Sequence, residues 1–114
     1  QPLIVPMIET CKGINAADAL AALKPVDALF YGPYDLSADL GVAGDLEHES
    51  VASALETLKA SCAKHAKAAG GHQVAPDPDA LTTLIEDGFR LIAYATDVIA
   101  MRHALTQGVQ RVDI

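Results

Sequence analysis

The sequence has few basic residues. Lys and Arg total 8 against 15 Asp and Glu, which gives a net charge of -7, and no basic run occurs anywhere in the chain. Proteins that bind nucleic acid or anionic membrane surfaces need clustered positive charge to neutralise phosphates. The composition therefore argues against both kinds of partner.

Cysteines and long apolar runs are also scarce. Cys11 and Cys62 lie 51 residues apart, outside any CxxC or Cys/His ligand spacing, so neither a zinc site nor a redox pair is indicated. No stretch approaches the roughly 20 apolar residues of a membrane-spanning helix, and the first residues lack the charged and apolar regions of a signal peptide. We expect reduced thiols in a soluble, cytoplasmic protein.

Apolar residues make up 51% of the 114 residues, which is enough to build a core, and no low-complexity linker divides the chain. Residues 1–114 are therefore predicted to form a single domain. Apolar runs predict strands at residues 3–9, 27–31, 72–75 and 89–95. Helical spacing of apolar residues predicts helices at residues 14–23, 51–69, 78–87 and 96–108, each following one of the strands or its loop.

Capping residues mark the ends of these helices. Asn15 and Ser50 are the expected N-caps of the first two, and Gly70-Gly71 is the expected stop of the second. Asp77 is expected to cap the third helix, whose first residue is proline and whose C-terminal stop is Gly88. Thr96 is the expected cap of the last helix.

The order is therefore β-α repeated four times, which predicts the α/β class with parallel strands. Such units form either a small open, doubly wound sheet or half of a (β/α)₈ barrel, which needs about 250 residues when complete. Length alone favours the open sheet.

Two acids follow neighbouring strands of this sheet. Glu9 closes the first strand, and Asp35 follows the second in a turn opened by Gly32 and Pro33. Because parallel strands all end at one edge, both carboxylates are expected on the same rim, within reach of a hard cation such as Mg²⁺. A solvated strand end at Glu9 and a helix cap at Asp35 are the simpler alternatives.

The residues around Asp35, "YDLSADL", are predicted to begin a short helix. Its free N–H groups at Tyr34 and Asp35 would favour an anion, which together with a metal suits a carboxylate next to a carbonyl. Ser37 is a candidate to orient Asp35, and Asp39 to contact the metal's waters. His72 is placed near a strand start, at the opposite rim, and the other histidines on solvated surfaces.

Two motifs carry a resemblance. The segments "MIET" and "GPYDLSADLG", with Asp35 following Glu9 by 26 residues, are similar to the metal-dependent (class II) pyruvate aldolases of the HpcH/HpaI family. The likeness continues through "APDPDALTTLIEDGFRLIAYATD" and spans essentially the whole chain, although only the second half of the family's sequence. Ala95, where the family often has Gly, and Met7, where it commonly has Gln, depart from the pattern.

The resemblance implies a metal-dependent lyase. Glu9 and Asp35 would be ligands of a divalent cation, most typically Mg²⁺, with Mn²⁺ or Co²⁺ as alternatives. The backbone of Tyr34 and Asp35, in the turn of Gly32 and Pro33, would hold the carboxylate of pyruvate or a 2-oxo acid. The reaction would be retro-aldol cleavage of a 4-hydroxy-2-oxo acid to pyruvate and an aldehyde through a metal-stabilised enolate. No Schiff-base lysine is needed, and no lysine stands at a predicted strand end.

The same resemblance favours a closed (β/α)₈ barrel, of which this chain would supply strands five to eight. The family's catalytic His and substrate-contacting Arg belong to the first four units, so activity is expected to require them. Open sheet edges predict a homo-oligomer or association with a complementary half-barrel. The alternatives are a non-catalytic α/β module that binds metal or an oxo acid, and a CoA-ester lyase of the citrate lyase β type.

Overall fold

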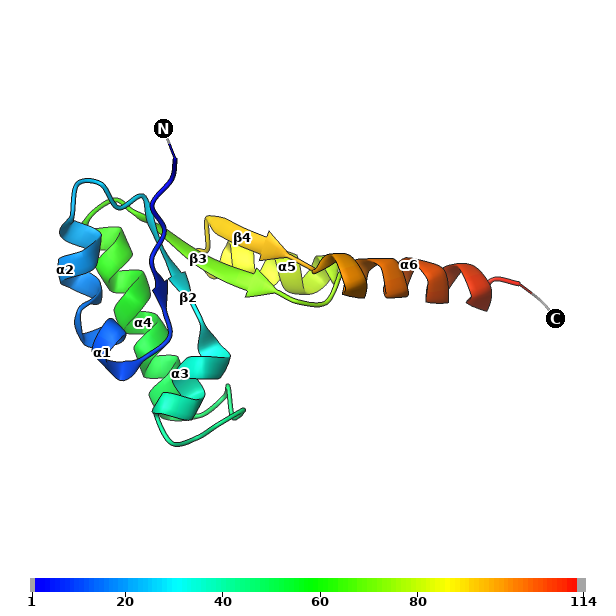
Figure 1. Cartoon of the computed structure of the whole chain (residues 1–114), viewed down its shortest axis with the longest axis horizontal. Helices are drawn as coiled ribbons and strands as arrows, with labels where there is room; N and C mark the ends of the chain where they lie inside the picture. The colour runs from blue at the N-terminus through cyan, green and yellow to red at the C-terminus, as the bar shows by residue number, and fades with distance from the viewer. Residues whose placement is uncertain (1, 113–114) are drawn as a thin grey trace.

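A computed structural model describes residues 2–112 of the chain as four strands alternating with helices (Figure 1). In chain order the elements are β1 (Met7–Ile8), α1 (Cys11–Asn15), α2 (Ala17–Ala22), β2 (Ala28–Tyr31), α3 (Pro33–Asp39), α4 (Glu49–Lys64), β3 (Ala68–Gln73), α5 (Pro78–Glu86), β4 (Leu91–Tyr94) and α6 (Asp97–Gln110). The alternation confirms the predicted α/β class.

The strands form one parallel sheet in the order β1-β2-β3-β4. Each strand therefore lies beside the one that precedes it in the sequence. A doubly wound sheet instead reverses its strand order at a switch point, whereas sequential order is the arrangement of a (β/α)₈ barrel. The preference for an open, doubly wound sheet, which rested on chain length alone, is wrong.

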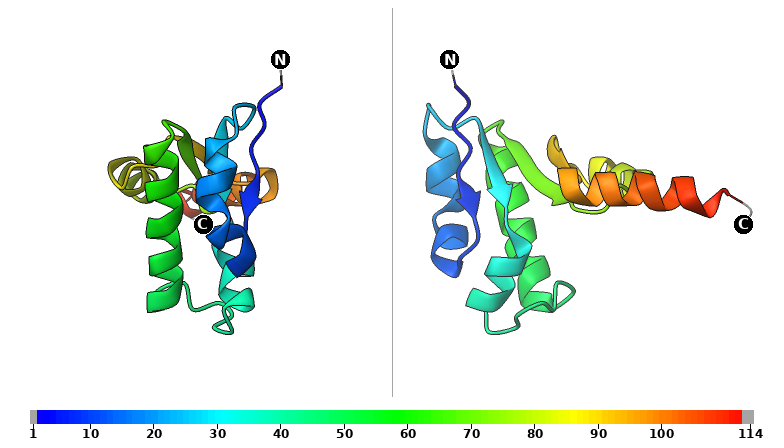
Figure 2. Two further views of the ribbon diagram at one scale, coloured as in Figure 1. Left: turned by 90° about the vertical axis from the view of Figure 1, so that its left-hand side faces the viewer. Right: turned by 45° about the vertical axis from the view of Figure 1, so that its right-hand side comes forward.

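The core lies between the helices and one face of the sheet. Along β2, Leu29 and Tyr31 are buried against the helical layer while Phe30 points to the opposite face, as the two-residue period of a strand requires. Leu58 of α4 and Leu36 of α3 are fully buried in the same cluster. Figure 2 shows α2 and α4 side by side along the strands that they cover.

Helix α4 ends earlier than expected. The chain leaves the helix through Ala66, which has φ 55°, and the Lys67 N–H donates to the Cys62 carbonyl at 2.9 Å while the Ala66 N–H donates to the Ala63 carbonyl at 3.2 Å. This pair of bonds is the Schellman motif, which usually places glycine at the left-handed position. Because alanine occupies it here, the sequence shows no stop, and the prediction that Gly70-Gly71 ends the helix is wrong.

Gly70 and Gly71 lie instead inside β3, which begins at Ala68 rather than at residue 72. A Cβ at Gly70 would lie 2.7 Å from the ring of Phe30, and one at Gly71 would lie 2.9 Å from the ring of Phe89. Side chains at these positions are excluded by aromatic rings on both faces of the sheet. The glycines therefore serve close packing and not a turn.

Three other boundaries differ from expectation. Thr10, not Asn15, caps the first helix by accepting from the Gly13 N–H, and His48, not Ser50, caps α4. The strand expected over residues 3–9 shortens to Met7–Ile8. The caps at Asp77 and Thr96 are confirmed, as is the stop at Gly88, which has φ 98°.

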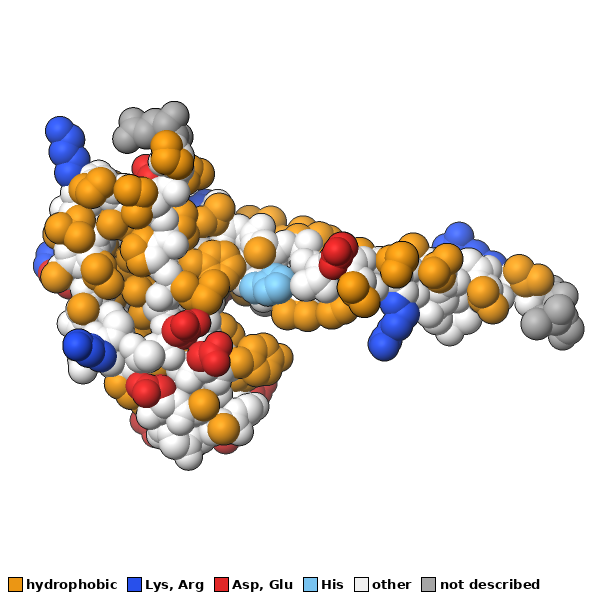
Figure 3. All heavy atoms as spheres, viewed as in Figure 1, with side chains coloured by type: hydrophobic (Ala, Val, Ile, Leu, Met, Phe, Trp, Pro, Cys, Tyr) orange, Lys and Arg blue, Asp and Glu red, His pale blue; other side chains and the backbone are white. Residues whose placement is uncertain are grey.

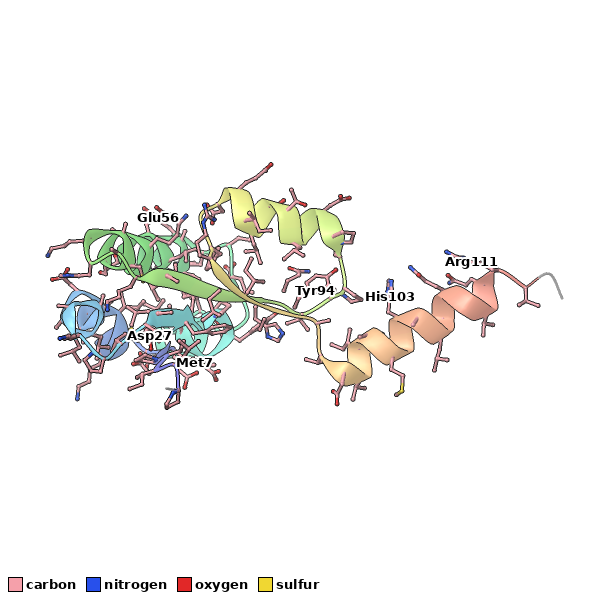
Figure 4. All side chains as sticks on the ribbon, turned by 90° about the horizontal axis from the view of Figure 1, so that it is seen from above. Met7, Asp27, Glu56, Tyr94, His103 and Arg111 are labelled. Carbon is pink, nitrogen blue, oxygen red and sulfur yellow. The ribbon has the colours of Figure 1, made fainter. Side chains whose placement is uncertain are left out.

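The C-terminal part projects away from this packed body. Neither α5 nor α6 contains a buried residue, and α6 extends beyond the sheet with the side chains of His103 and Arg111 away from other elements (Figures 1 and 4). The radius of gyration is 16.4 Å, compared with about 13 Å for a compact domain of this length. None of the helices between residues 2 and 112 combines the length and apolar character needed to cross a membrane.

Candidate metal centre and substrate site

The candidate site lies where β1 and β2 end at the same edge of the sheet. Ile8 pairs with Tyr31 in the parallel register, and the Gly32 N–H donates to the Ile8 carbonyl at 3.0 Å. Glu9 comes directly after β1, and Asp35 lies in the first turn of α3, which follows β2. Figure 3 shows acidic side chains gathered around the end of β1 and α3.

Glu9 lies across Gly32. A Cβ added to Gly32 would come within 3.0 Å of the Glu9 Cβ and 3.3 Å of its Oε2, and the Glu9 side chain is half-buried. The absence of a side chain at Gly32 thus leaves the space that the Glu9 carboxylate occupies. Gly32 has a positional role at this site in addition to forming the turn.

Asp35 is exposed in the first turn of α3. The first hydrogen bond of this helix runs from the Leu36 N–H to the Gly32 carbonyl at 3.1 Å. The N–H groups of Tyr34 and Asp35 precede that bond, so they have no acceptor within the helix. They remain available to an anionic group beside the carboxylates.

Ser37 fixes the shape of this turn. Its hydroxyl is fully buried, donates to the Tyr34 carbonyl at 2.7 Å and accepts from the Gly44 N–H at 2.9 Å. Both contacts hold backbone, so the hydroxyl stabilises the turn and the loop behind it. The structure does not bring Ser37 to the Asp35 carboxylate, which the sequence had suggested.

Asp39 joins the two acid-bearing segments. Its carboxylate accepts from the Cys11 N–H, at the start of α1, at 2.7 Å. The backbone hydrogen bond from Cys11, supported by a bond from its side chain, lowers the pKa of Asp39, and the Asp39 carboxylate in turn raises the pKa of the Cys11 thiol. The carboxylate therefore holds the loop after β1 against α3 and is engaged with the α1 N-terminus, not with the candidate metal position.

A hollow of about 140 Å³ opens beside Asp35 on the face of the sheet that the helices leave uncovered. It is lined by Met7, Phe30, Tyr31, Gly32, Pro33, Tyr34, Asp35, His72 and Val74. His72 is the penultimate residue of β3, so its expected place at a strand start is wrong. The error follows from the misplaced end of α4, because moving the strand start back to Ala68 puts His72 at the carboxyl edge with Asp35.

The donor set suits a hard divalent cation. Two carboxylates at adjacent strand ends, one of them seated in the space over Gly32, match Mg²⁺, which binds through one or two carboxylates and completes its shell with water and substrate oxygens. Within residues 2–112 no cluster of three or more His, Cys, Asp or Glu side chains is arranged around a common point.

These strand ends and motifs have counterparts in known proteins. A model of the HpcH/HpaI aldolase/citrate lyase family matches residues 1–104. The chain belongs to this family. The "MIET" and "GPYDLSADLG" segments that carry the resemblance lie within the matched range.

Individual relatives agree with this assignment. The chain is 37% identical to a hydroxypyruvate/pyruvate aldolase of Paraburkholderia phytofirmans over 95% of its length and 41% of the relative. It is 35% identical to a 5-keto-4-deoxy-D-glucarate aldolase of Klebsiella pneumoniae over 89% of its length and 39% of the relative. The chain therefore spans about two fifths of these proteins.

A solved structure confirms the fold. An HpcH/HpaI aldolase/citrate lyase family protein from Burkholderia cenocepacia superposes with a TM-score of 0.85 at 34% identity, over 96% of this chain and 42% of that one. The four βα units thus correspond to part of the (β/α)₈ barrel of these aldolases. The predicted family and barrel-type fold class are confirmed.

Proposed function

We propose that this chain is the metal-ligating part of a divalent-metal-dependent aldolase. The reaction would cleave a 4-hydroxy-2-oxo acid into pyruvate and an aldehyde. The observation that carries the proposal is the placement of Glu9 and Asp35 after adjacent parallel strands, with Gly32 leaving the space for the Glu9 carboxylate. The aldolase names of its relatives support the reaction class.

Different residues of this chain would bind the cation and the substrate carboxylate. Glu9 and Asp35 would hold the cation, most suitably Mg²⁺, with Mn²⁺ or Co²⁺ also compatible with carboxylate oxygens. The N–H groups of Tyr34 and Asp35 would bind the carboxylate of the 2-oxo acid at the start of α3. When bound, the cation supplies Lewis-acid stabilisation of the negative charge that develops on the oxo oxygen as the carbon–carbon bond breaks.

Calorimetric titration tests the metal ligands. Mg²⁺ is added to the parent chain, to Glu9→Gln and to Asp35→Asn, each with and without oxalate as a stand-in for the 2-oxo acid. We expect oxalate to tighten Mg²⁺ binding in the parent, because its two oxygens complete the shell, and each substitution to weaken binding at least tenfold by removing a charged ligand.

Two exposed acids outside the site provide matched controls. Glu47→Gln and Asp45→Asn remove the same charges from the loop before α4, and both are expected to bind like the parent. If the Glu9 and Asp35 variants also bind like the parent, the assignment of the metal ligands is wrong.

Turnover is expected to need more than this chain. One face of the sheet carries Met7, which is 57% exposed, and β1 and β4 each pair on one side only among the described residues. We propose that a complementary half-barrel supplies the missing walls and the catalytic base. The isolated chain should bind Mg²⁺ and oxalate without cleaving 4-hydroxy-2-oxopentanoate in a coupled pyruvate assay. Cleavage by the isolated chain would contradict this requirement.

The uncovered surfaces also favour self-association. Helix α6 carries a stripe of exposed apolar residues at helical spacing, Val98, Met101, Leu105 and Val109, each 60–65% exposed. We propose that this stripe packs against a second copy or a complementary half-barrel. Sedimentation velocity should show concentration-dependent association that Leu105→Glu reduces, whereas the exposed polar change Thr106→Glu on the same helix should leave it unchanged.

A further inference from the structure

His72 faces the hollow beside Asp35, a role that neither the sequence motifs nor the metal assignment gives it. In the parallel register His72 pairs with Ala93, and it lies two residues beyond Gly70, which is packed against Phe30. The two-residue period of the strand places His72 on the same face as Phe30. Its exposed ring lines the hollow together with Asp35 and Tyr34.

The imidazole is anchored at one nitrogen. Nε2 lies 3.3 Å from the Ala95 carbonyl, an acceptor, so Nε2 carries the proton of that bond. Nδ1 has no hydrogen-bond partner among residues 2–112. It is therefore a free acceptor on the neutral ring and a free donor on the charged one, and a hydroxyl group satisfies either form because it both donates and accepts.

The lining of the hollow has two polar poles with apolar walls between them. Asp35 and the N–H groups of α3 form one pole, His72 forms the other, and Met7, Phe30 and Val74 supply apolar surface. A ligand that fits this pattern binds through a carboxylate and carbonyl at one end and carries a single polar group a few atoms away. The Tyr31 hydroxyl is occupied in donating to the Val51 carbonyl, so the exposed Tyr34 hydroxyl is the other side-chain hydroxyl of the lining that could contact this polar group.

We propose that His72 is a specificity-determining residue, which hydrogen-bonds a hydroxyl on the part of the 2-oxo acid beyond its oxo group. The inference rests on the proposed function, because the metal end of the ligand defines which end reaches His72. It assigns to His72 the discrimination between hydroxylated and non-hydroxylated 2-oxo acids of the same length. His72 acts here in binding, and no proton transfer is assigned to it.

The test compares two ligands that differ by one hydroxyl. The Mg²⁺-loaded chain is titrated calorimetrically with 4-hydroxy-2-oxopentanoate and with 2-oxopentanoate, and the ratio of the two Kd values is the readout. We expect the parent to prefer the hydroxylated ligand by about 2- to 12-fold, the usual effect of one hydrogen bond. In His72→Phe, which keeps the ring but removes both nitrogens, the ratio should fall close to one.

Two further variants separate recognition from structure. His72→Asn restores a short polar side chain and should recover part of the preference, which a purely structural loss would not allow. His103→Phe makes the same replacement on α6, away from the hollow, and should keep the parent ratio. Thermal unfolding of each variant checks that the fold is retained.

The outcomes distinguish this inference from the proposed function. If Glu9→Gln abolishes binding of both ligands while His72→Phe keeps the parent ratio, the metal assignment stands and the role of His72 is refuted. A parent without preference for the hydroxylated ligand refutes it equally. A parent that binds neither ligand in the presence of Mg²⁺ overturns both proposals.

Discussion

Residues 2–73 and residues 74–112 use the same local signals but differ in burial. The first region encloses all buried apolar side chains of the described chain except Phe89. The second has well-capped helices, with Asp77 and Thr96 bonded to the N–H groups that they cap, and yet neither helix contains a fully buried residue. Helix formation in the second region is thus specified locally, whereas its packing is not satisfied within this chain.

This difference in burial indicates which parts of the chain lack packing neighbours. In a (β/α)₈ barrel each strand and helix packs on neighbours from both sides, so the units at either end of a partial barrel lack half of their contacts. β1, at the other end of the sheet, also lacks packing neighbours on one side, and Leu3 and Met7 beside it are more than half exposed. The middle units, β2 with α3 and α4, are the best packed, and they carry Asp35, whereas Glu9 follows β1 at the edge of the sheet.

The largest expected contrast comes from equal truncations in the two regions. Leu58→Ala empties a fully buried position on α4 and should lower the free energy of unfolding by about 2–5 kcal/mol. Leu105→Ala removes a side chain that is 64% exposed on α6 and should change it by less than about 0.5 kcal/mol. Urea unfolding followed by circular dichroism measures both, and equal losses would show that the two regions are packed alike.

Glycine-to-alanine substitutions test the same contrast through overpacking. A Cβ at Gly71 meets the Phe89 ring at 2.9 Å, so Gly71→Ala should cost about 1–3 kcal/mol as the ring is displaced. At Gly108, inside α6, a Cβ meets no neighbour within 4 Å, and alanine should stabilise the helix by up to about 1 kcal/mol. The urea midpoints should therefore shift in opposite directions.

The two regions also differ in how well the sequence predicted them. In the second region the helix boundaries were marked by residues with local roles, the caps Asp77 and Thr96 and the stop Gly88, and those predictions are confirmed. In the first region the end of α4 depends on a left-handed alanine, and β3 contains glycines whose role is to admit aromatic rings from distant segments. Neither feature has a local signature.

The candidate site shows the same division. The positions of Glu9 and Asp35 after neighbouring strands followed from the order of elements, since parallel strands share one carboxyl edge. The contacts of Asp39 with Cys11 and of His72 with the hollow depend on tertiary register, which apolar periodicity does not specify. Whether the two carboxylates share a cation remains a prediction for titration to test.

Relief of backbone strain should also change the stability of the two regions differently, by less than the substitutions above. Ala66 and Ala95 both have left-handed φ angles, of 55° and 59°, which cost a residue with a Cβ about 1 kcal/mol. Ala66→Gly, at the end of α4, should raise the free energy of global unfolding by about that amount. We expect the segment around Ala95 to open independently of the core, because its helices contain no buried residue. Ala95→Gly should then leave global stability nearly unchanged and instead slow amide exchange locally around β4 and α6. Equal global gains would contradict independent opening.

The smallest expected effect is on stability at low pH. It concerns the contact between Asp39 and Cys11, which links the segments that carry the two proposed metal ligands. The pKa of Asp39 is lowered in the folded chain by the Cys11 N–H, so its stabilising contribution is complete above the ordinary carboxyl pKa of about 4 and is lost as the pH falls through the lower folded value. Asp39→Asn should flatten the acid side of the stability curve, while Asp45→Asn should not. In the parent, amide exchange in α1 should accelerate over this range more than exchange in α6, since only α1 is held by this carboxylate. A similar acceleration in both helices would show that acid acts on the chain as a whole and would remove Asp39 as the link between the loop after β1 and α3.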